Sequence, residues 1–354
     1  MIGKTRQSLL VFLSMLLVSC STDPAEKDRP ESIPLRETDS VKAVHINRFD
    51  SDMRALGTSP TAADVSRLRQ KHGRFFELWC GQLAGITSPL DTAPSNAEIA
   101  YNLSQYLSDE YIRSLMHDCD SAFKDIAWLE ERLAPVMDRY ERGFPGQIIP
   151  GIITFVEPFN YKVMAMDSSA GIGLHYYLGS EYKYYPSLQL PQYMVRKMDR
   201  EYMVHDLVKG WLDSEYLDDS AQNSCLSQMI YQGKIMYTMD MLDPTMHDTI
   251  KTGFSEEQYT WALNNEYDLW AFFVGQKLLY NTNPKVYLKY IHDGNTTSGF
   301  PKQAPARLGP FIGWKIVRAY MKNHPEMNLK ELFAKRNAQS ILLESGYQPE
   351  KNKD

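Results

Sequence analysis

Cysteine is scarce in this sequence of 354 residues, which contains 4 cysteines. Cys20 closes an N-terminal apolar segment, whereas Cys80, Cys119 and Cys225 lie far apart in the chain. No two cysteines stand a few residues apart, so the sequence lacks the spacing of a zinc knuckle. One disulfide among the last three cysteines stays open as an alternative, but we favour three buried, unpaired thiols.

An excess of positive charge is also missing. The sequence has 38 Lys and Arg against 44 Asp and Glu, and no basic run interrupts it. Loss of Lys4 and Arg6 with a cleaved leader would leave 36 basic residues against 44 acidic ones. We therefore expect no nucleic-acid partner, and anionic lipid headgroups are poor candidates as well.

The first twenty residues lack an apolar run that is long enough to cross a bilayer. The run Leu9–Val18 is about half of the roughly 20 residues that a spanning helix needs. It follows Lys4 and Arg6 and leads to Cys20, an order typical of a bacterial lipoprotein signal. We expect residues 1–19 to be removed, and Cys20 to receive a diacylglyceryl group and an N-terminal acyl chain such as palmitate. An ordinary signal peptide with an incidental cysteine is the alternative.

The segment that follows the signal is poor in apolar residues. Residues 20–45 are rich in Pro, Ser, Asp and Glu, which predicts a flexible tether, and residues 46–354 are expected to form a single domain. Two or three acyl chains would hold Cys20 stably on a bilayer. Ser21–Pro24 lacks the acidic run of surface-export signals, so we expect an outer-membrane lipoprotein that faces the periplasm.

The apolar periodicity predicts a predominantly helical α+β domain. One long helix is expected through Val65–Leu83, and another is expected to begin with the capping box of Ser255 and to continue through Phe273. Between the helical regions, β-branched and aromatic residues predict a small sheet. Its expected strands are 147–158, 163–166 and 171–178.

Motifs of common hydrolases and phosphate-binding proteins are absent from the sequence. It contains no G-x-S-x-G and no glycine-rich phosphate loop. The order of a small sheet, a helix with His205 and a second helix is, however, the layout of zincin metallopeptidases. Those enzymes carry H-E-x-x-H on the first helix, so that two imidazoles share one face.

The metal motif of that layout is degenerate in this chain. Lys209 stands where the second histidine is needed, Asp206 replaces the general-base glutamate, and Gln232 occupies the expected position of the third ligand. We expect neither a metal nor a cofactor, because an ammonium group and an amide do not replace an imidazole and a carboxylate as zinc ligands. If the zincin-like scaffold is right, His205, Lys209 and Gln232 should share one polar cluster under a groove. Otherwise His205 is simply a polar residue of an amphipathic helix.

Several longer segments resemble GldB, the gliding-motility-associated lipoprotein family of Bacteroidota. The segments that carry this resemblance are Gly173–Gly179, Tyr184–Pro186, Leu190–Tyr193, Asp206–Trp211, Gln228–Lys234, Glu266–Phe273 and Gly309–Tyr320. The resemblance implies a membrane-anchored envelope protein of the gliding or type IX secretion-type machinery. It also implies kinship with zincin-like peptidases, and GldB proteins have lost the metal motif of those peptidases.

Three functions are compatible with these observations. The first is a non-catalytic envelope component whose groove binds a polypeptide partner, by strand addition near Ile152–Phe155. The second is an envelope hydrolase of the zincin-like peptidase type, and the third is a lipoprotein that binds a glycan or another small molecule. We favour the first, because two of the three zinc-ligand positions are occupied by Lys209 and Gln232.

Overall fold

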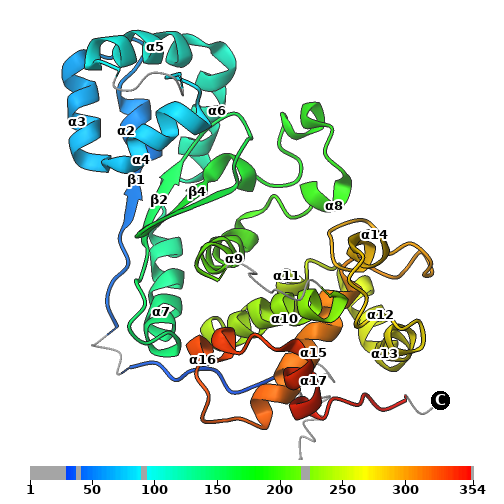
Figure 1. Cartoon of the computed structure of the whole chain (residues 1–354). Coiled ribbons are helices and arrows are strands. Elements are labelled where there is room, and N and C mark those ends of the chain that lie inside the picture. The colour runs from blue at the N-terminus through cyan, green and yellow to red at the C-terminus, as the bar shows by residue number, and fades with distance from the viewer. Residues whose placement is uncertain (1–28, 37–40, 89–93, 217–223, 352–354) are drawn as a thin grey trace, which may run out of the picture.

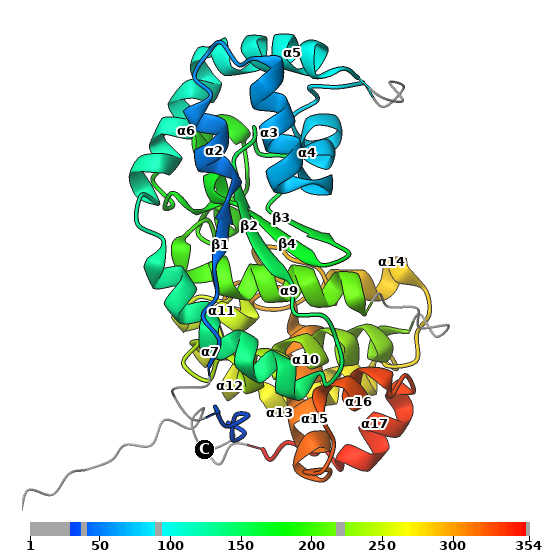
Figure 2. The ribbon, with the colours of Figure 1, turned by 90° about the vertical axis from the view of Figure 1, so that its left-hand side faces the viewer.

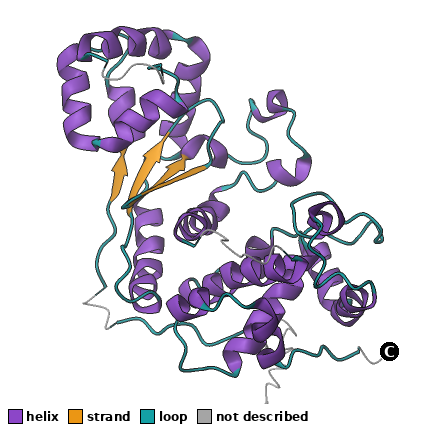
Figure 3. Ribbon diagram, viewed as in Figure 1, coloured by secondary structure: helices purple, strands orange, loops and turns teal. Residues whose placement is uncertain are grey.

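The computed structural model describes residues 29–36, 41–88, 94–216 and 224–351. Within these ranges the chain is mostly helical with one small sheet, which confirms the predominantly helical α+β class (Figures 1 and 3). Cys20 and the predicted signal lie outside the described residues. Among the described helices, none is both long and apolar enough for a membrane span.

The sheet of the described chain consists of four strands in the order β1-β2-β4-β3. β1, β2 and β4 are parallel neighbours, and β3 pairs antiparallel with β4 as an edge strand. The bounds are Ile46–Arg48 for β1, Gly151–Phe155 for β2, Val163–Met166 for β3 and Ser169–Gly173 for β4.

The sheet corrects two sequence-based expectations. Ile152–Phe155 belongs to β2, which is enclosed by β1 and β4, so strand addition cannot occur there. The strand expected over 171–178 ends at Gly173 and turns into a 3-10 helix at Leu174–Tyr177. The sequence does not predict β1, because a strand of only three residues is too short to show an alternating pattern.

The N-terminal helices gather into one lobe at the top of both ribbon views (Figures 1 and 2). They are α2 (Phe49–Ala55), α3 (Ala62–His72), α4 (Arg74–Leu78), a π-helical turn (Trp79–Leu83), α5 (Asn96–Ser108) and α6 (Glu110–Ala122). The single helix predicted through Val65–Leu83 is wrong, because Gly73 adopts a φ of +52° and separates α3 from α4. That left-handed conformation favours glycine and ends a helix.

The remaining helices lie beside and below the sheet in Figure 1. They are α7 (Ala127–Gly143), α8 (Gln192–Val195), α9 (Met203–Glu215), α10 (Cys225–Leu242), α11 (Asp248–Thr252), α12 (Glu256–Asn264), α13 (Glu266–Gly275), α14 (Pro284–Tyr287), α15 (Leu308–Lys322), α16 (Leu329–Ala334) and α17 (Ala338–Ser345). The capping box of Ser255 is confirmed, but the helix expected to run through Phe273 stops before Asn265. The side-chain Nδ2 of Asn265 donates a hydrogen bond to Trp261 O at 2.7 Å and marks the break between α12 and α13.

Two close approaches at glycine residues fix the packing of helices α9, α10 and α15. α10 and α15 cross at Gly233 and Gly313, where a Cβ atom on Gly313 would lie 1.8 Å from Met229 O. α9 packs against β3 at Gly210, where a Cβ atom would lie 2.5 Å from a methyl group of Val163. Glycine is therefore required for both contacts, and the second holds α9 directly beside the edge strand.

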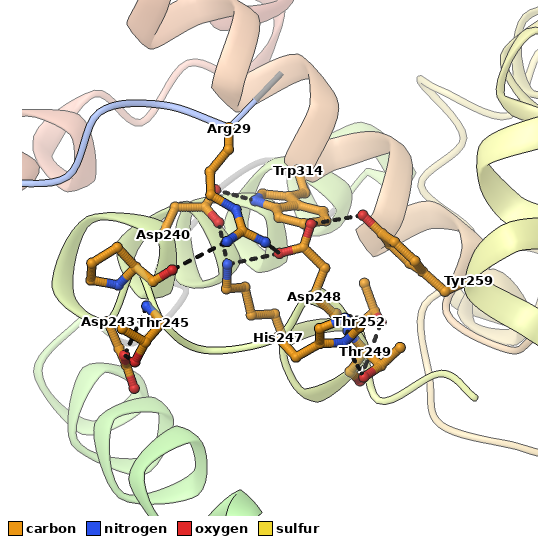
Figure 4. A network of polar contacts seen from close by, with 12 residues as sticks. Arg29, Asp240, Asp243, Thr245, His247, Asp248, Thr249, Thr252, Tyr259 and Trp314 are labelled. Carbon is orange, nitrogen blue, oxygen red and sulfur yellow. Dashed lines mark hydrogen bonds and ion pairs between the residues drawn. The ribbon is translucent and has the colours of Figure 1, made fainter. Parts of the chain in front are cut away.

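A buried ionic network joins α10, α11 and α15 (Figure 4). Asp240 is fully buried and accepts hydrogen bonds from Lys251 Nζ at 2.8 Å, Trp314 Nε1 at 2.8 Å and Arg318 Nε at 2.7 Å. Lys251 Nζ also contacts Asp248 Oδ1 at 2.8 Å. Each buried charge thus has an opposite charge beside it, as low-dielectric interiors require.

Part of the segment predicted as a tether contacts this network. Arg29 Nη2 lies 3.1 Å from Asp248 Oδ1, and Ile33 N donates to Met241 O at 3.3 Å. Arg139 Nε donates to Ile33 O at 2.8 Å. Residues 29–36 therefore lie along α7 and α10 in the structure.

The three cysteines that follow Cys20 are buried in the described core. Cys80, Cys119 and Cys225 are free thiols, and burial raises the pKa of each thiol. Raised pKa values keep the thiols protonated and therefore unreactive.

Candidate binding site

A cavity of about 450 Å³ lies between α9 and the C-terminal helices. His205, Asp206, Lys209 and Gln232, which the sequence singles out, all line it. The rest of its wall is formed by Lys162, Tyr176, Leu190, Met194, Lys197, Met198, Tyr202, Gln228, Ile250, Gly253, Ile291, His292, Asp293 and Arg307. Its volume is within the usual range for small-ligand pockets.

The amphipathic character of α9 places the polar residues on the cavity side. Leu207, Val208 and Trp211 are buried, whereas Asp206 and Lys209 line the cavity. Trp211 Nε1 donates to the Tyr140 hydroxyl at 2.9 Å, which ties the buried face of α9 to α7. The i, i+1, i+4 positions of His205, Asp206 and Lys209 bring all three to the same wall.

Asp206 is the centre of one polar cluster of the cavity. Its carboxylate contacts Lys162 Nζ at 2.5 Å, the Tyr177 hydroxyl at 3.0 Å and His205 Nδ1 at 3.0 Å. Burial would raise the pKa of Asp206, but Lys162 and His205 outweigh it and hold this pKa well below its usual value. Burial lowers the pKa of His205, despite the neighbouring carboxylate, so the imidazole is neutral at pH 7.

Lys209 and Gln232 are engaged in contacts that do not resemble metal ligation. Lys209 Nζ forms an ion pair with Asp213, which also accepts a hydrogen bond from the Tyr231 hydroxyl at 2.8 Å. Gln232 Oε1 accepts from Arg307 Nη2 at 3.4 Å. The donor set at the zincin-like positions therefore does not fit zinc, since Lys162 pairs with the Asp206 carboxylate and Lys209 replaces the second imidazole. Across the described ranges, no group of three or more His, Cys, Asp or Glu side chains is placed to hold a metal ion.

A second cluster of the wall has an excess of positive charge. Asp293 contacts Lys197 Nζ at 3.0 Å and Arg307 Nε at 3.6 Å. Burial alone would raise the pKa of Asp293. The opposite effect of Arg307 and Lys197 is larger, so the pKa is lowered overall. Arg307 also donates to Thr252 O at 3.1 Å and has a φ of +58°, an uncommon conformation for a residue with a side chain.

This second cluster is not evident from the sequence. Lys197 follows α8, Asp293 lies in the loop before α15, and Arg307 precedes α15. Lys162, which immediately precedes β3, joins the wall from another segment. Because no short motif links these positions, only the tertiary structure brings them together.

The wall of the cavity combines charged, aromatic and apolar side chains. Among the described residues that line the cavity, none is Ser, Thr or Cys, so the wall offers no hydroxyl or thiol nucleophile of the serine or cysteine hydrolase type. The Asp206 carboxylate contacts the His205 imidazole, the Lys162 ammonium group and the Tyr177 hydroxyl. The apolar side chains of Leu190, Met194 and Ile250 complete a mixed surface.

Comparison with known proteins gives one family. The family model described as gliding motility protein GldB matches residues 33–349 of the chain. This range includes the whole described sheet and every residue of the cavity wall. No curated protein and no solved structure shows a significant match.

Proposed function

The chain belongs to the family of gliding motility protein GldB, and we propose that it is a non-catalytic, membrane-anchored lipoprotein that binds a polypeptide partner. Family membership implies a gliding-motility-associated lipoprotein of the cell envelope. The proposal adds an anchor at Cys20, a position on the outer membrane facing the periplasm, and a role in motility or type IX secretion-type machinery. The degenerate positions His205, Asp206, Lys209 and Gln232 are then remnants of a zincin-like site that now belongs to a binding cavity.

The observation that carries the proposal is the edge strand β3 beside the cavity. β3 is the edge of the described sheet on this side, and Lys162, which immediately precedes it, lines the cavity. Gly173 N donates to Lys162 O at 2.9 Å, so Lys162 and Gly173 form a hydrogen-bonded pair of the antiparallel ladder. By the alternation of such ladders, the N–H groups of Val163 and Ala165 face away from β4. An extended polypeptide can add to such an edge.

A small-molecule or glycan ligand is the second candidate. Tyr176 and Tyr202 line the cavity together with Met194 and Met198, and its volume suits such a ligand. Binding of this kind would use the side chains of the wall and would not depend on the outer edge of β3. A substitution confined to that edge therefore separates the two candidates.

Replacement of Ala165 by proline is expected to weaken capture of the polypeptide partner by about tenfold. Proline removes an N–H group that faces outward and places its ring where the added strand would lie, whereas a ladder bond to β4 is not lost. Quantitative mass spectrometry after cross-linking in membranes measures this, with Ala165→Ser as the matched control that keeps the N–H group. Equal recovery of every co-purified polypeptide with both variants would contradict strand addition at β3.

A further inference from the structure

Building on the proposed polypeptide partner, we infer that the cavity beside β3 binds a carboxylate group of that polypeptide. The cations that would recognise it are Lys162, Lys197, Lys209 and Arg307, which line the cavity from four different segments. Apolar side chains between them would hold the aliphatic part of the residue that carries the carboxylate.

The charge of the wall opposes the charge of the whole protein. Four cationic side chains line the cavity, but only two carboxylates do, those of Asp206 and Asp293. With histidines counted as neutral, the wall therefore has two positive charges in excess, whereas the complete chain has a net charge of −6. A cationic concavity on an acidic protein focuses the electrostatic potential and attracts an anion.

The ion pairs of the wall compensate this excess only in part. Lys197 and Arg307 share the single carboxylate of Asp293, and their side chains are only 14% and 12% exposed. Lys209 pairs with Asp213, which does not line the cavity. Burial lowers the pKa of Lys197, and the neighbouring Arg307 and Lys162 add to this effect despite Asp293. A further anion would stabilise Lys197 and Arg307, whose side chains are largely removed from water.

The position of the cations favours a carboxylate that arrives on an extended chain. Lys162 immediately precedes β3, so a strand paired with Val163 and Ala165 would run past it toward the cavity. Leu190, Met194 and Ile291 line the same space and suit an aliphatic stem. A free carboxyl terminus and a Glu or Asp side chain present the same group, and an experiment with defined peptides distinguishes them.

The test uses the mature full-length protein in detergent and fluorescence anisotropy with three labelled peptides. The first is an N-terminally capped Val/Thr peptide with a free carboxyl terminus, the second is its neutral amide, and the third is the amide with one glutamate. We expect at least one carboxylate-bearing peptide to bind about tenfold more tightly than the neutral amide, since charge-assisted hydrogen bonds are the stronger ones. Preference for the first peptide assigns a terminal carboxylate, and preference for the third assigns an acidic side chain.

Variants of the wall decide whether the cavity is responsible. Lys197→Gln and Lys209→Gln should each remove most of the preference, Lys197→Arg should retain it, and Lys124→Gln, at an exposed site in the N-terminal lobe, should leave it unchanged. The two glutamine substitutions lie on different segments, so loss of folding in one leaves the other informative. Equal affinity for all three peptides would overturn the inference while leaving strand addition intact. Inorganic phosphate that binds through Lys197 and Lys209 while no carboxylate peptide binds would also overturn it.

Discussion

Replacement of Cys20 by alanine is expected to move nearly all of the protein from the membrane fraction to the soluble fraction, or to leave its precursor unprocessed. The thiol of Cys20 is the predicted acceptor of the diacylglyceryl group, and the predicted signal run is too short to remain as a spanning anchor. In addition, no described helix could replace it as a membrane span. Two or three acyl chains on Cys20 anchor a protein stably, and the alanine variant would carry none of them.

Fractionation and intact-mass analysis of the processed chain measure this effect. Ser21→Ala is the matched control, because it changes the neighbouring residue and keeps the thiol. The control should remain membrane-bound with the added mass of the acyl chains. A Cys20→Ala protein that is processed normally and stays fully in the membrane would refute lipid anchoring at this residue.

Replacement of Asp240 by asparagine is expected to lower the free energy of unfolding by about 3–5 kcal/mol, because breaking a buried ion pair leaves charges without compensation. Asp240 is fully buried and accepts two hydrogen bonds from Arg318, at 2.7 and 2.8 Å, and one from Lys251 at 2.8 Å. Asparagine keeps the shape of the side chain but not its charge. Asp248 would then be the carboxylate left to compensate both Lys251 and Arg318.

Urea denaturation followed by circular dichroism tests this value. Glu181→Gln, at an exposed position in a turn, removes a negative charge without touching the network and should change stability by no more than about 0.5 kcal/mol. A loss below about 1 kcal/mol for Asp240→Asn would mean that hydration or rearrangement compensates the two cations. The buried network would then contribute little to holding α10, α11 and α15 together.

The helices and the β2–β4 region follow from local patterns, whereas breaks and edges depend on tertiary context. Apolar spacing predicts α7 and α9, because each presents an apolar face to the core, and it predicts α10, which is buried over most of its length. The break at Gly73 requires a positive φ, which a periodic pattern does not reveal. β1 exists because its three residues pair with β2, about a hundred positions later, and its own sequence holds no comparable signal.

The residues of the candidate site also differ in whether the sequence predicts their position. His205, Lys209 and Gln232 line the same cavity, and the sequence predicts their proximity by analogy with the two helices of a zincin-like layout. Lys197 and Arg307 could not be predicted, because they come from irregular segments whose course is set by packing. The sequence therefore predicts a degenerate metal site at His205, Asp206, Lys209 and Gln232, and the structure adds Lys197 and Arg307 to the same wall.

The zinc content of the mature protein, purified without chelator, tests most directly the claim that the cavity is a non-catalytic binding site. Elemental analysis should find far less than stoichiometric zinc, since Lys209 and Gln232 cannot supply the missing ligands. The triple variant Asp206→Glu, Lys209→His, Gln232→Glu should gain about one zinc per chain if these positions derive from a zincin-like site. About one zinc per chain in the unmodified protein would contradict the account and make His205 and Asp206 candidates for catalysis.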